Sequence, residues 1–163
     1  MVGLERREAV GRRRDLAVLP TRAALAAGML YHGVDKLKGD NRQRTAEFFE
    51  STGIRPGHFW ARATGITETA AGALSLLGLL TRPAALAVLV TQGMAIAKVH
   101  APRGFSTTKG GYEYNLTLMA IAAALLVAGP GRFSAHEVIE RAADRRRPWR
   151  TRGFLSRLIR LVK

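Results

Sequence analysis

Four long stretches of this chain are apolar and almost uncharged, and they constrain its fold more than any other feature. They span about residues 16–34, 61–80, 83–100 and 112–129. A helix needs about 20 mainly apolar residues to cross the hydrocarbon core of a membrane. The helices of a soluble bundle would carry a polar stripe, whereas Thr117 is the one polar residue between Leu116 and Ala128. The pattern therefore predicts an all-α fold, an integral membrane four-helix bundle over residues 16–131.

Single residues inside these stretches carry further information. Arg22 lies near one end of the first stretch, from where a long side chain can extend to the membrane surface. The second stretch carries small residues at every fourth position, a spacing that lets helices approach closely in lipid; they are Ala61, Gly65, Thr69 and Ala73. Small residues of this kind serve a homo-oligomer as well as a monomer, so the oligomeric state stays open.

Charged residues gather outside the stretches. The chain has 26 Lys and Arg against 12 Asp and Glu, a formal net charge of +14, and both termini are basic. An even number of spans places both termini on one side, and the positive-inside rule makes that side the cytoplasm. We therefore expect a multi-pass protein of the plasma membrane with a cytoplasmic arm at 1–15 and a cytoplasmic tail at 132–163. The segment 36–60 is basic as well, so the charge signal is not clean.

The predicted tail has its own pattern. Ser134 and Glu137 have the spacing of a helix capping box. Further on, apolar residues can share one helical face with basic residues beside it, namely Phe154, Leu155, Leu158, Ile159 and Val162. This pattern predicts a basic amphipathic helix on the inner leaflet, with a solvated tail as the alternative. Basic flanks of a membrane protein need no nucleic acid to explain them, and none is expected as a partner.

The predicted topology brings polar residues of all four spans to one level in the outer half of the membrane. These candidate site residues are His32, Asp35, Lys36, Glu68, Lys98, His100, Glu113 and Asn115. An ionisable group buried in lipid costs several kcal/mol unless it is paired or faces a cavity. Glu68 is the acid that lies deepest in a span, and we expect it to pair with Lys98 or His100. Asp35 and Lys36 are expected to form a similar network with Glu113.

Three interpretations of this polar layer stay open. It can be a pocket for a quinone, a small solute, a lipid or a partner chain, or it can be a salt-bridge network that only fixes the helices. A metal site from His32, His100 and either Glu68 or Glu113 is the least favoured, because no short His-x₃-His or Glu-x₂-His spacing supports it. No metal and no catalytic residue is assigned. Gln92 is expected to hydrogen-bond across helices, and His58 and His136 to lie on the surface.

The same residues carry a resemblance to a known family. The motifs are HGVDKL at 32–37, FF at 48–49, GIRP at 53–56, Glu68 followed by AGAL at 71–74, GLLTR at 78–82, GF at 104–105, GGYEYNL at 110–116 and GPGRFS at 129–134. In this order and spacing they resemble the DoxX family over about residues 20–135. The basic termini lie outside the resemblance.

The resemblance implies a four-helix membrane protein linked to redox chemistry. It implies a membrane subunit or anchor of an oxidoreductase complex, with a quinone as the cofactor and with superoxide dismutase, a sulfurtransferase or a respiratory complex as partners. This role is that of a non-catalytic subunit. The chain has no cysteine, so sulfur exchange must come from a partner. The alternatives are a small-solute or lipid binding or transport protein, and a structural scaffold in the lipid bilayer.

Overall fold

The computed structural model describes the backbone of residues 2–145 and the side chains of residues 9–144. Within this part the chain is all-helical and has no strand, as predicted. Short π and 3₁₀ segments follow α4 at Ile96–His100 (η1), Ala101–Arg103 (η2) and Thr107–Lys109 (η3). The α-helices are α1 (Val2–Leu37), α2 (Gly39–Ser51), α3 (Gly57–Leu77), α4 (Thr81–Ala95), α5 (Glu113–Ala128) and α6 (Ala135–Arg145).

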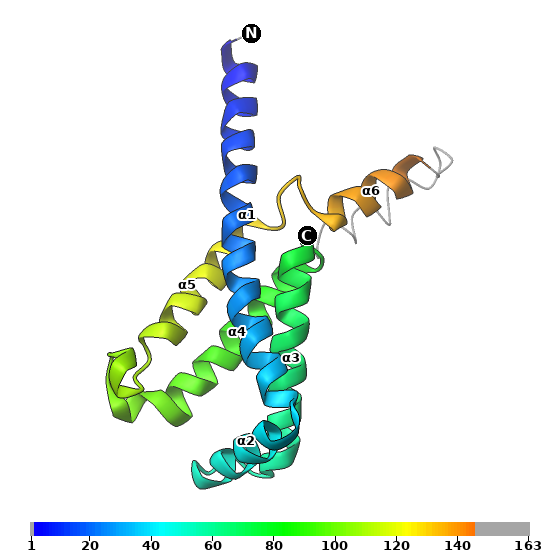
Figure 1. Ribbon diagram of the computed structural model, residues 1–163. Coiled ribbons are helices and arrows are strands. Elements are labelled where there is room, and N and C mark those ends of the chain that lie inside the picture. Colours follow the sequence, from blue (N-terminus) through cyan, green and yellow to red (C-terminus); the bar gives the residue numbers. More distant parts are fainter. Residues whose placement is uncertain (1, 146–163) are drawn as a thin grey trace.

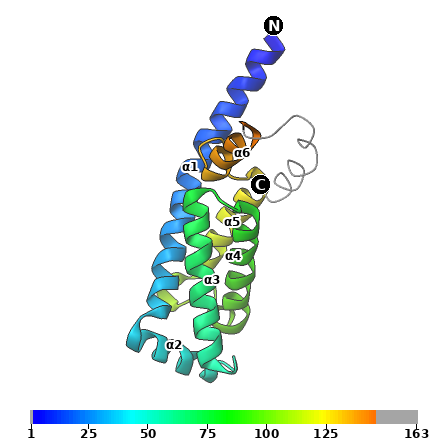
Figure 2. The ribbon, with the colours of Figure 1, turned by 90° about the vertical axis from the view of Figure 1, so that its right-hand side faces the viewer.

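Four helices pack around a common core. α1 and α4 each pack against both α3 and α5, while α2 lies across one end and α6 lies near the other (Figures 1 and 2). Leu25, Met29, Val88 and Leu125 are fully buried in this core. The core is built from apolar side chains on facing helix surfaces, which is the arrangement that hydrophobic burial favours.

Small residues bring α1 and α3 into close contact. A Cβ atom on Gly33 would lie 2.5 Å from the backbone nitrogen of Thr69, and one on Gly72 would lie 2.9 Å from the backbone nitrogen of Leu30. A Cβ on Gly65 would meet the side chain of Leu37 at 2.8 Å. Gly65 and Thr69 belong to the predicted series of small residues, and for these two the predicted role in close helix packing is confirmed.

Two segments differ from the sequence-based expectation. The predicted loop at 36–60 contains α2, which packs against α3. Gly57 allows this contact, because a Cβ atom at this position would overlap the carbonyl oxygen of Ala46. Polar side chains of α2 form hydrogen bonds with residues one helical turn away: Thr45 donates to Asn41 O, and Gln43 donates to the carboxylate of Glu47. The second segment is the predicted arm at 1–15, which is helical, since α1 begins at Val2 and extends beyond the other helices (Figure 1).

Arg22 does not extend to the surface but is buried, with 5% of its area exposed. Its guanidinium donates to Ser75 O at 2.8 Å and Leu76 O at 2.5 Å in the last turn of α3. It also donates to Pro130 O at 3.1 Å and Phe133 O at 2.7 Å. The side chain therefore caps the carboxyl end of α3, where a cation is favourable, and ties the segment after α5 to it.

The start of α6 confirms one prediction and corrects another. The hydroxyl of Ser134 accepts a hydrogen bond from the backbone N–H of Glu137, as expected for the amino-terminal cap. His58 is exposed as predicted, but His136 is 7% exposed and therefore buried. As the second residue of α6, His136 lies on the face turned away from solvent. The predicted amphipathic helix at 154–162 lies outside the described residues.

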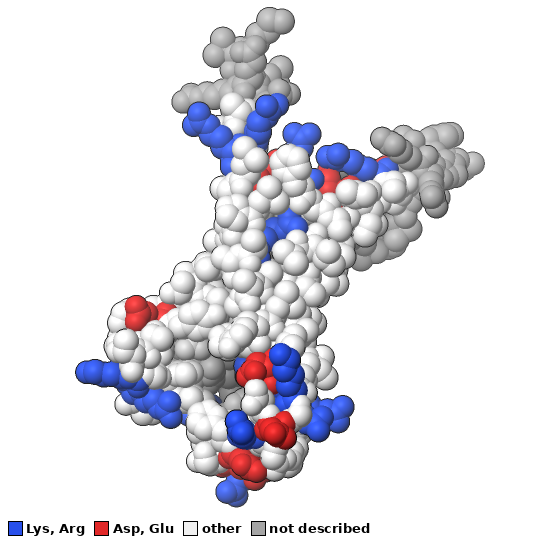
Figure 3. Space-filling model, viewed as in Figure 1, with Lys and Arg blue, Asp and Glu red and all other residues white. Residues whose placement is uncertain are grey.

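Among the described helices, one segment is both long and apolar enough to cross a membrane by itself, namely Thr81–Arg103, which includes α4. α5 is apolar but shorter. Large apolar side chains are exposed on all four central helices, for example Leu19, Ile66, Leu86 and Val127. On the face shown in Figure 3, most charged side chains lie toward the two ends, and the middle is largely uncharged.

Candidate functional site

A cavity of about 750 Å³ lies at the α2 end of the molecule. Residues of α1, α2 and α3 line one side, and residues of α4, η1 and α5 line the other. Figure 3 shows the surface hollowed near this end, between two groups of charged side chains. The exposed surface of the lining is mostly apolar, although about half of the lining residues are polar or charged. Apolar surface with polar groups that orient a ligand is typical of small-molecule sites.

The strongest polar feature in the cavity is an ion pair between α1 and α3. Lys36 Nζ lies 2.6 Å from Glu68 Oε2, and it also lies 3.4 Å from His32 O. Glu68 is 5% exposed, so its carboxylate depends on this partner. The predicted pairing of Glu68 with Lys98 or His100 is wrong. The close contact of α1 with α3 brings Lys36 to Glu68, whereas Lys98 is exposed and does not line the cavity.

A second polar pair joins α4 and α5. Asn115 Nδ2 donates to Gln92 Oε1 at 2.8 Å, and both side chains are buried. The predicted cross-helix hydrogen bond of Gln92 is thus confirmed. Both residues line the cavity, and their remaining amide donors and acceptors are available there for a ligand.

Two histidines line the cavity from opposite sides. The ring of His32 on α1 lies against the ring of Tyr114, with centroids 5.5 Å apart. His100 Nδ1 lies 2.7 Å from Gly110 O. Because a carbonyl oxygen only accepts, Nδ1 carries the proton, and Nε2 of the neutral ring is left as an acceptor. His100 can therefore accept a hydrogen bond from a ligand, or donate one when the ring is protonated.

The remaining candidates have other partners. Asp35 lines the cavity, and its Oδ1 accepts a hydrogen bond from Asn41 Nδ2 at 2.7 Å, which links α1 to α2. Glu113 is exposed and accepts the backbone N–H of Thr107 at 3.1 Å. Glu113 is not a lining residue. The predicted network of Asp35 and Lys36 with Glu113 is therefore wrong, because each of these side chains binds a nearer group.

Aromatic and apolar side chains complete the wall. Phe48 and Phe49 come from α2, and Trp60 comes from the first turn of α3. Sequence reasoning missed the contribution of α4 and its extension, because these residues lack polar atoms or lie in an apolar span. They are Val90, Thr91, Met94, Ala95 and Val99. Helical periodicity is the signal that finds them, since Val90, Thr91, Met94 and Ala95 lie on one face of α4.

The part of the chain with described side chains contains no group of three or more His, Asp or Glu residues that could hold a metal ion. His32 and His100 each line the cavity, but no metal-binding set forms around them. The chemistry that the described site offers is hydrogen bonding and charge beside an apolar volume.

Comparison with known proteins identifies the family. Residues 17–101, about half of the chain, match the model of the DoxX family. A protein of Mycobacterium tuberculosis (strain ATCC 25618 / H37Rv), described as "Uncharacterized membrane protein Rv3486", is 33% identical over 105 residues. The match covers 58% of this chain and 64% of that protein, and no solved structure matches. The chain belongs to the DoxX family of membrane proteins.

Proposed function

We propose that this protein spans the plasma membrane four times, with cytoplasmic termini, and binds an amphipathic small molecule in the cavity at the α2 end. A membrane quinone is the ligand that this site fits best. In this role the protein is the membrane subunit of a quinone-linked oxidoreductase complex. The observation that carries the proposal is the cavity itself, in which mostly apolar surface lies beside polar and charged residues from several helices.

The four-span placement is supported by the surface of the helices. Exposed apolar side chains on α1, α3, α4 and α5 are unfavourable in water and favourable against lipid tails. Lys and Arg residues at the α6 end fit the cytoplasmic side, including the exposed Arg12, Arg13 and Arg14 of α1. With this orientation the cavity lies toward the outer face.

The lining suits the two parts of a quinone. The ring and the isoprenoid tail need apolar surface, which Phe48, Phe49, Trp60 and the α4 residues provide. The ring carbonyls need hydrogen-bond donors, and the Lys36 ammonium and the His32 ring, each with N–H groups, line the same cavity. A cavity of about 750 Å³ is within the usual range for small-molecule sites. A bound quinone would carry electrons, while these residues would orient its carbonyls and Glu68 would hold the Lys36 side chain in place.

The partner enzyme must supply the remaining chemistry. The chain has no cysteine, so it has no thiol for sulfur transfer. The basic residues of α1 beyond the other helices offer a surface for an acidic cytoplasmic enzyme, because complementary charge speeds and orients docking. A superoxide dismutase, a sulfurtransferase or a respiratory complex are the partner classes to test.

Extraction of the protein in mild detergent, followed by mass spectrometry of copurifying proteins and small molecules, tests the proposal. We expect a quinone with the wild-type protein and its loss from the Ala95→Phe variant, in which a phenyl ring fills the cavity. Ala124→Phe is the matched control, because Ala124 is an exposed residue of α5 that does not line the cavity. Two results contradict quinone binding. One is a quinone that copurifies equally with both variants, and the other is the absence of a quinone from the wild-type protein and from both variants. A different lipid that follows the same pattern would support the alternative of a lipid-binding protein.

A further inference from the structure

We propose a second binding site, for the phosphate group of an anionic membrane lipid, at the end of the molecule opposite α2. The site is a pocket of about 360 Å³ around the segment 129–131, between α1, the start of α4 and the start of α6. The inference rests on the four-span placement proposed above, but it does not depend on quinone binding.

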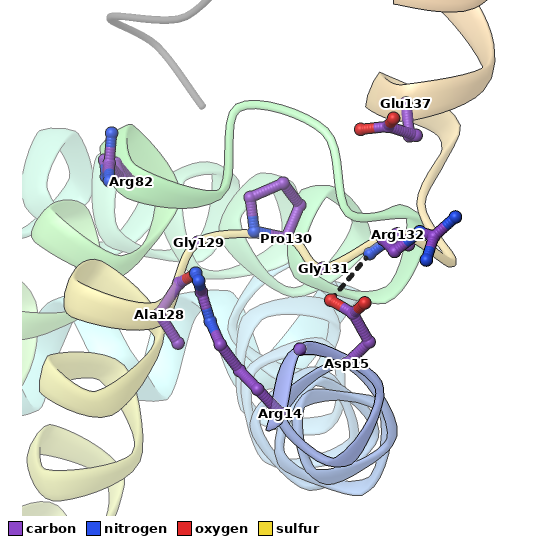
Figure 4. A pocket seen from close by; sticks show the side chains of 10 residues that line it. Arg14, Asp15, Arg82, Ala128, Gly129, Pro130, Gly131, Arg132 and Glu137 are labelled. Carbon is purple, nitrogen blue, oxygen red and sulfur yellow. Dashed lines mark hydrogen bonds between the residues drawn. The ribbon is translucent and has the colours of Figure 1, made fainter. Parts of the chain in front are cut away.

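Three arginine residues line this pocket, namely Arg14 of α1, Arg82 of α4 and Arg132 after α5. Figure 4 shows that Arg14 reaches the segment 129–131, with Arg82 on one side of that segment and Arg132 on the other. The planar guanidinium matches the oxygen atoms of a phosphate with paired hydrogen bonds. Arg14 and Arg82, which lie on the same side of the segment, are the pair best placed to bind a phosphate in this pocket.

The acidic residues of the pocket have other partners. Asp15 Oδ1 accepts the backbone N–H of Arg132 at 3.1 Å. Glu137 Oε1 lies 3.3 Å from Arg141 Nε, one helical turn along α6. Among the described side chains, no carboxylate lies within 4 Å of the guanidinium groups of Arg14, Arg82 or Arg132. Three arginines line the pocket with two carboxylates, Asp15 and Glu137, so the lining carries a net positive charge that favours an anion.

Backbone contacts fix two of the guanidinium groups and leave donors available. Arg14 donates to Ala128 O, and Arg82 Nε donates to Leu126 O at 3.2 Å, both at the carboxyl end of α5. Each guanidinium has five N–H donors, so several remain after one such bond. The buried Arg22 donates to Pro130 O, a residue of the pocket lining, and adds a further positive charge beneath it.

The position in the fold favours a lipid headgroup over a free anion. α5 ends and α4 begins beside the pocket, so it lies where the proposed spans reach the inner membrane surface. Basic pockets between helices on the cytoplasmic side are suited to anionic lipid headgroups. Exposed apolar residues of the same helices, among them Val127 and Leu86, can contact the acyl chains of a lipid held there.

Native mass spectrometry of the full chain in detergent tests this site with three probes: phosphatidylglycerol, phosphatidylcholine and inorganic phosphate. We expect phosphatidylglycerol to bind about tenfold more tightly than phosphatidylcholine. The double variant Arg14→Gln/Arg82→Gln should lose this preference. Arg42→Gln/Arg44→Gln is the matched control, because it removes the same charge from exposed residues of α2 at the other end. If the first double variant does not fold, Arg82→Lys keeps the charge, removes the planar group and should reduce the preference.

Four results would overturn the proposal. The first is an equal loss of phosphatidylglycerol binding in the control, which would indicate general charge attraction. The second is a lower melting temperature of Arg14→Gln/Arg82→Gln with an unchanged lipid preference, which would make the two arginines only caps of α5. The third is an unchanged preference in Arg82→Lys. The fourth is inorganic phosphate that binds as tightly as phosphatidylglycerol and displaces it, which would assign the pocket to a free anion.

Discussion

The two ends of the molecule differ in the groups that bind a cationic side chain, which is partly exposed at one end and buried at the other. At the α2 end, Lys36 meets the carboxylate of Glu68 beside an open cavity. At the other end, Arg22 is surrounded by backbone carbonyl oxygens of α3 and of the segment after α5. Carbonyl contacts of this kind hold segments together, whereas a charged pair beside a cavity is accessible to a ligand. Arg22 therefore has a structural role, and the proposed function gives Lys36 and Glu68 a role in binding.

Removal of Arg22 should have the largest effect on stability. Arg22→Met leaves four carbonyl oxygens without their charged donor, and we expect a loss of about 3–5 kcal/mol in the free energy of unfolding. Denaturant titration in detergent measures this loss. Arg62→Met, at an exposed position of α3, should change stability by less than about 0.5 kcal/mol. An equal effect of the two variants would contradict the structural role of Arg22.

For the Lys36–Glu68 pair we expect a smaller effect on stability than for Arg22, together with an effect on ligand binding. Glu68→Leu leaves the Lys36 ammonium without its partner, and we expect a loss of about 2–3 kcal/mol. The double variant Lys36→Met/Glu68→Leu should recover most of that stability while ligand binding remains lost. Unfolding and quinone copurification, measured on both variants, separate the two effects. Recovery of ligand binding in the double variant would make the pair a structural element only.

Contact between α1 and α3 is what brings this pair together, and a single methyl group should disturb it. Gly33→Ala places a Cβ 2.5 Å from the backbone nitrogen of Thr69, and we expect a loss of about 1–3 kcal/mol. Gly93→Ala is the control, because a Cβ there meets no atom within 4 Å. Thermal unfolding of the two variants compares them directly, and a less stable Gly93→Ala would contradict this packing.

The smallest effect is expected at the amide pair of α4 and α5. Gln92→Leu or Asn115→Leu each leaves one buried amide without its partner, at a cost of about 1–2 kcal/mol. The double variant removes both polar groups and should cost less than the two single variants added together. A double-mutant cycle measures this coupling, and additive losses would show that the hydrogen bond contributes little.

Sequence patterns predicted those parts of the fold that depend on local composition. The last three apolar stretches coincide closely with α3, with α4 and η1, and with α5, and the first lies within the longer α1. The small residues Gly65 and Thr69 lie at the α1–α3 contact. α2 was not predicted, because its residues are mostly polar and its position depends on the contact of Ala46 with Gly57. Propensity alone is a weak guide where tertiary packing decides the structure.

Part of the candidate site could also be predicted from the sequence, because the position of each polar residue along its predicted span gives the depth of that residue in the membrane. Of the predicted residues, His32, Asp35, Lys36, Glu68, His100 and Asn115 line one cavity. Depth does not give the rotation of a helix about its axis, however, so the partner of Glu68 was predicted incorrectly. Lys98 and Glu113 are close to the cavity along the chain, but they are exposed and do not line it.

The most direct test of the proposed function uses the tryptophan in the cavity wall. The chain has two Trp residues, Trp60 and Trp149, so Trp149→Phe leaves Trp60, a residue of the cavity lining, as the single tryptophan, which can be excited selectively over tyrosine. Titration of this variant with a short-chain quinone should give saturable quenching, which Ala95→Phe abolishes and Ala124→Phe leaves unchanged. Quenching that rises without saturation, or that is the same in all three proteins, would contradict a quinone site in the cavity.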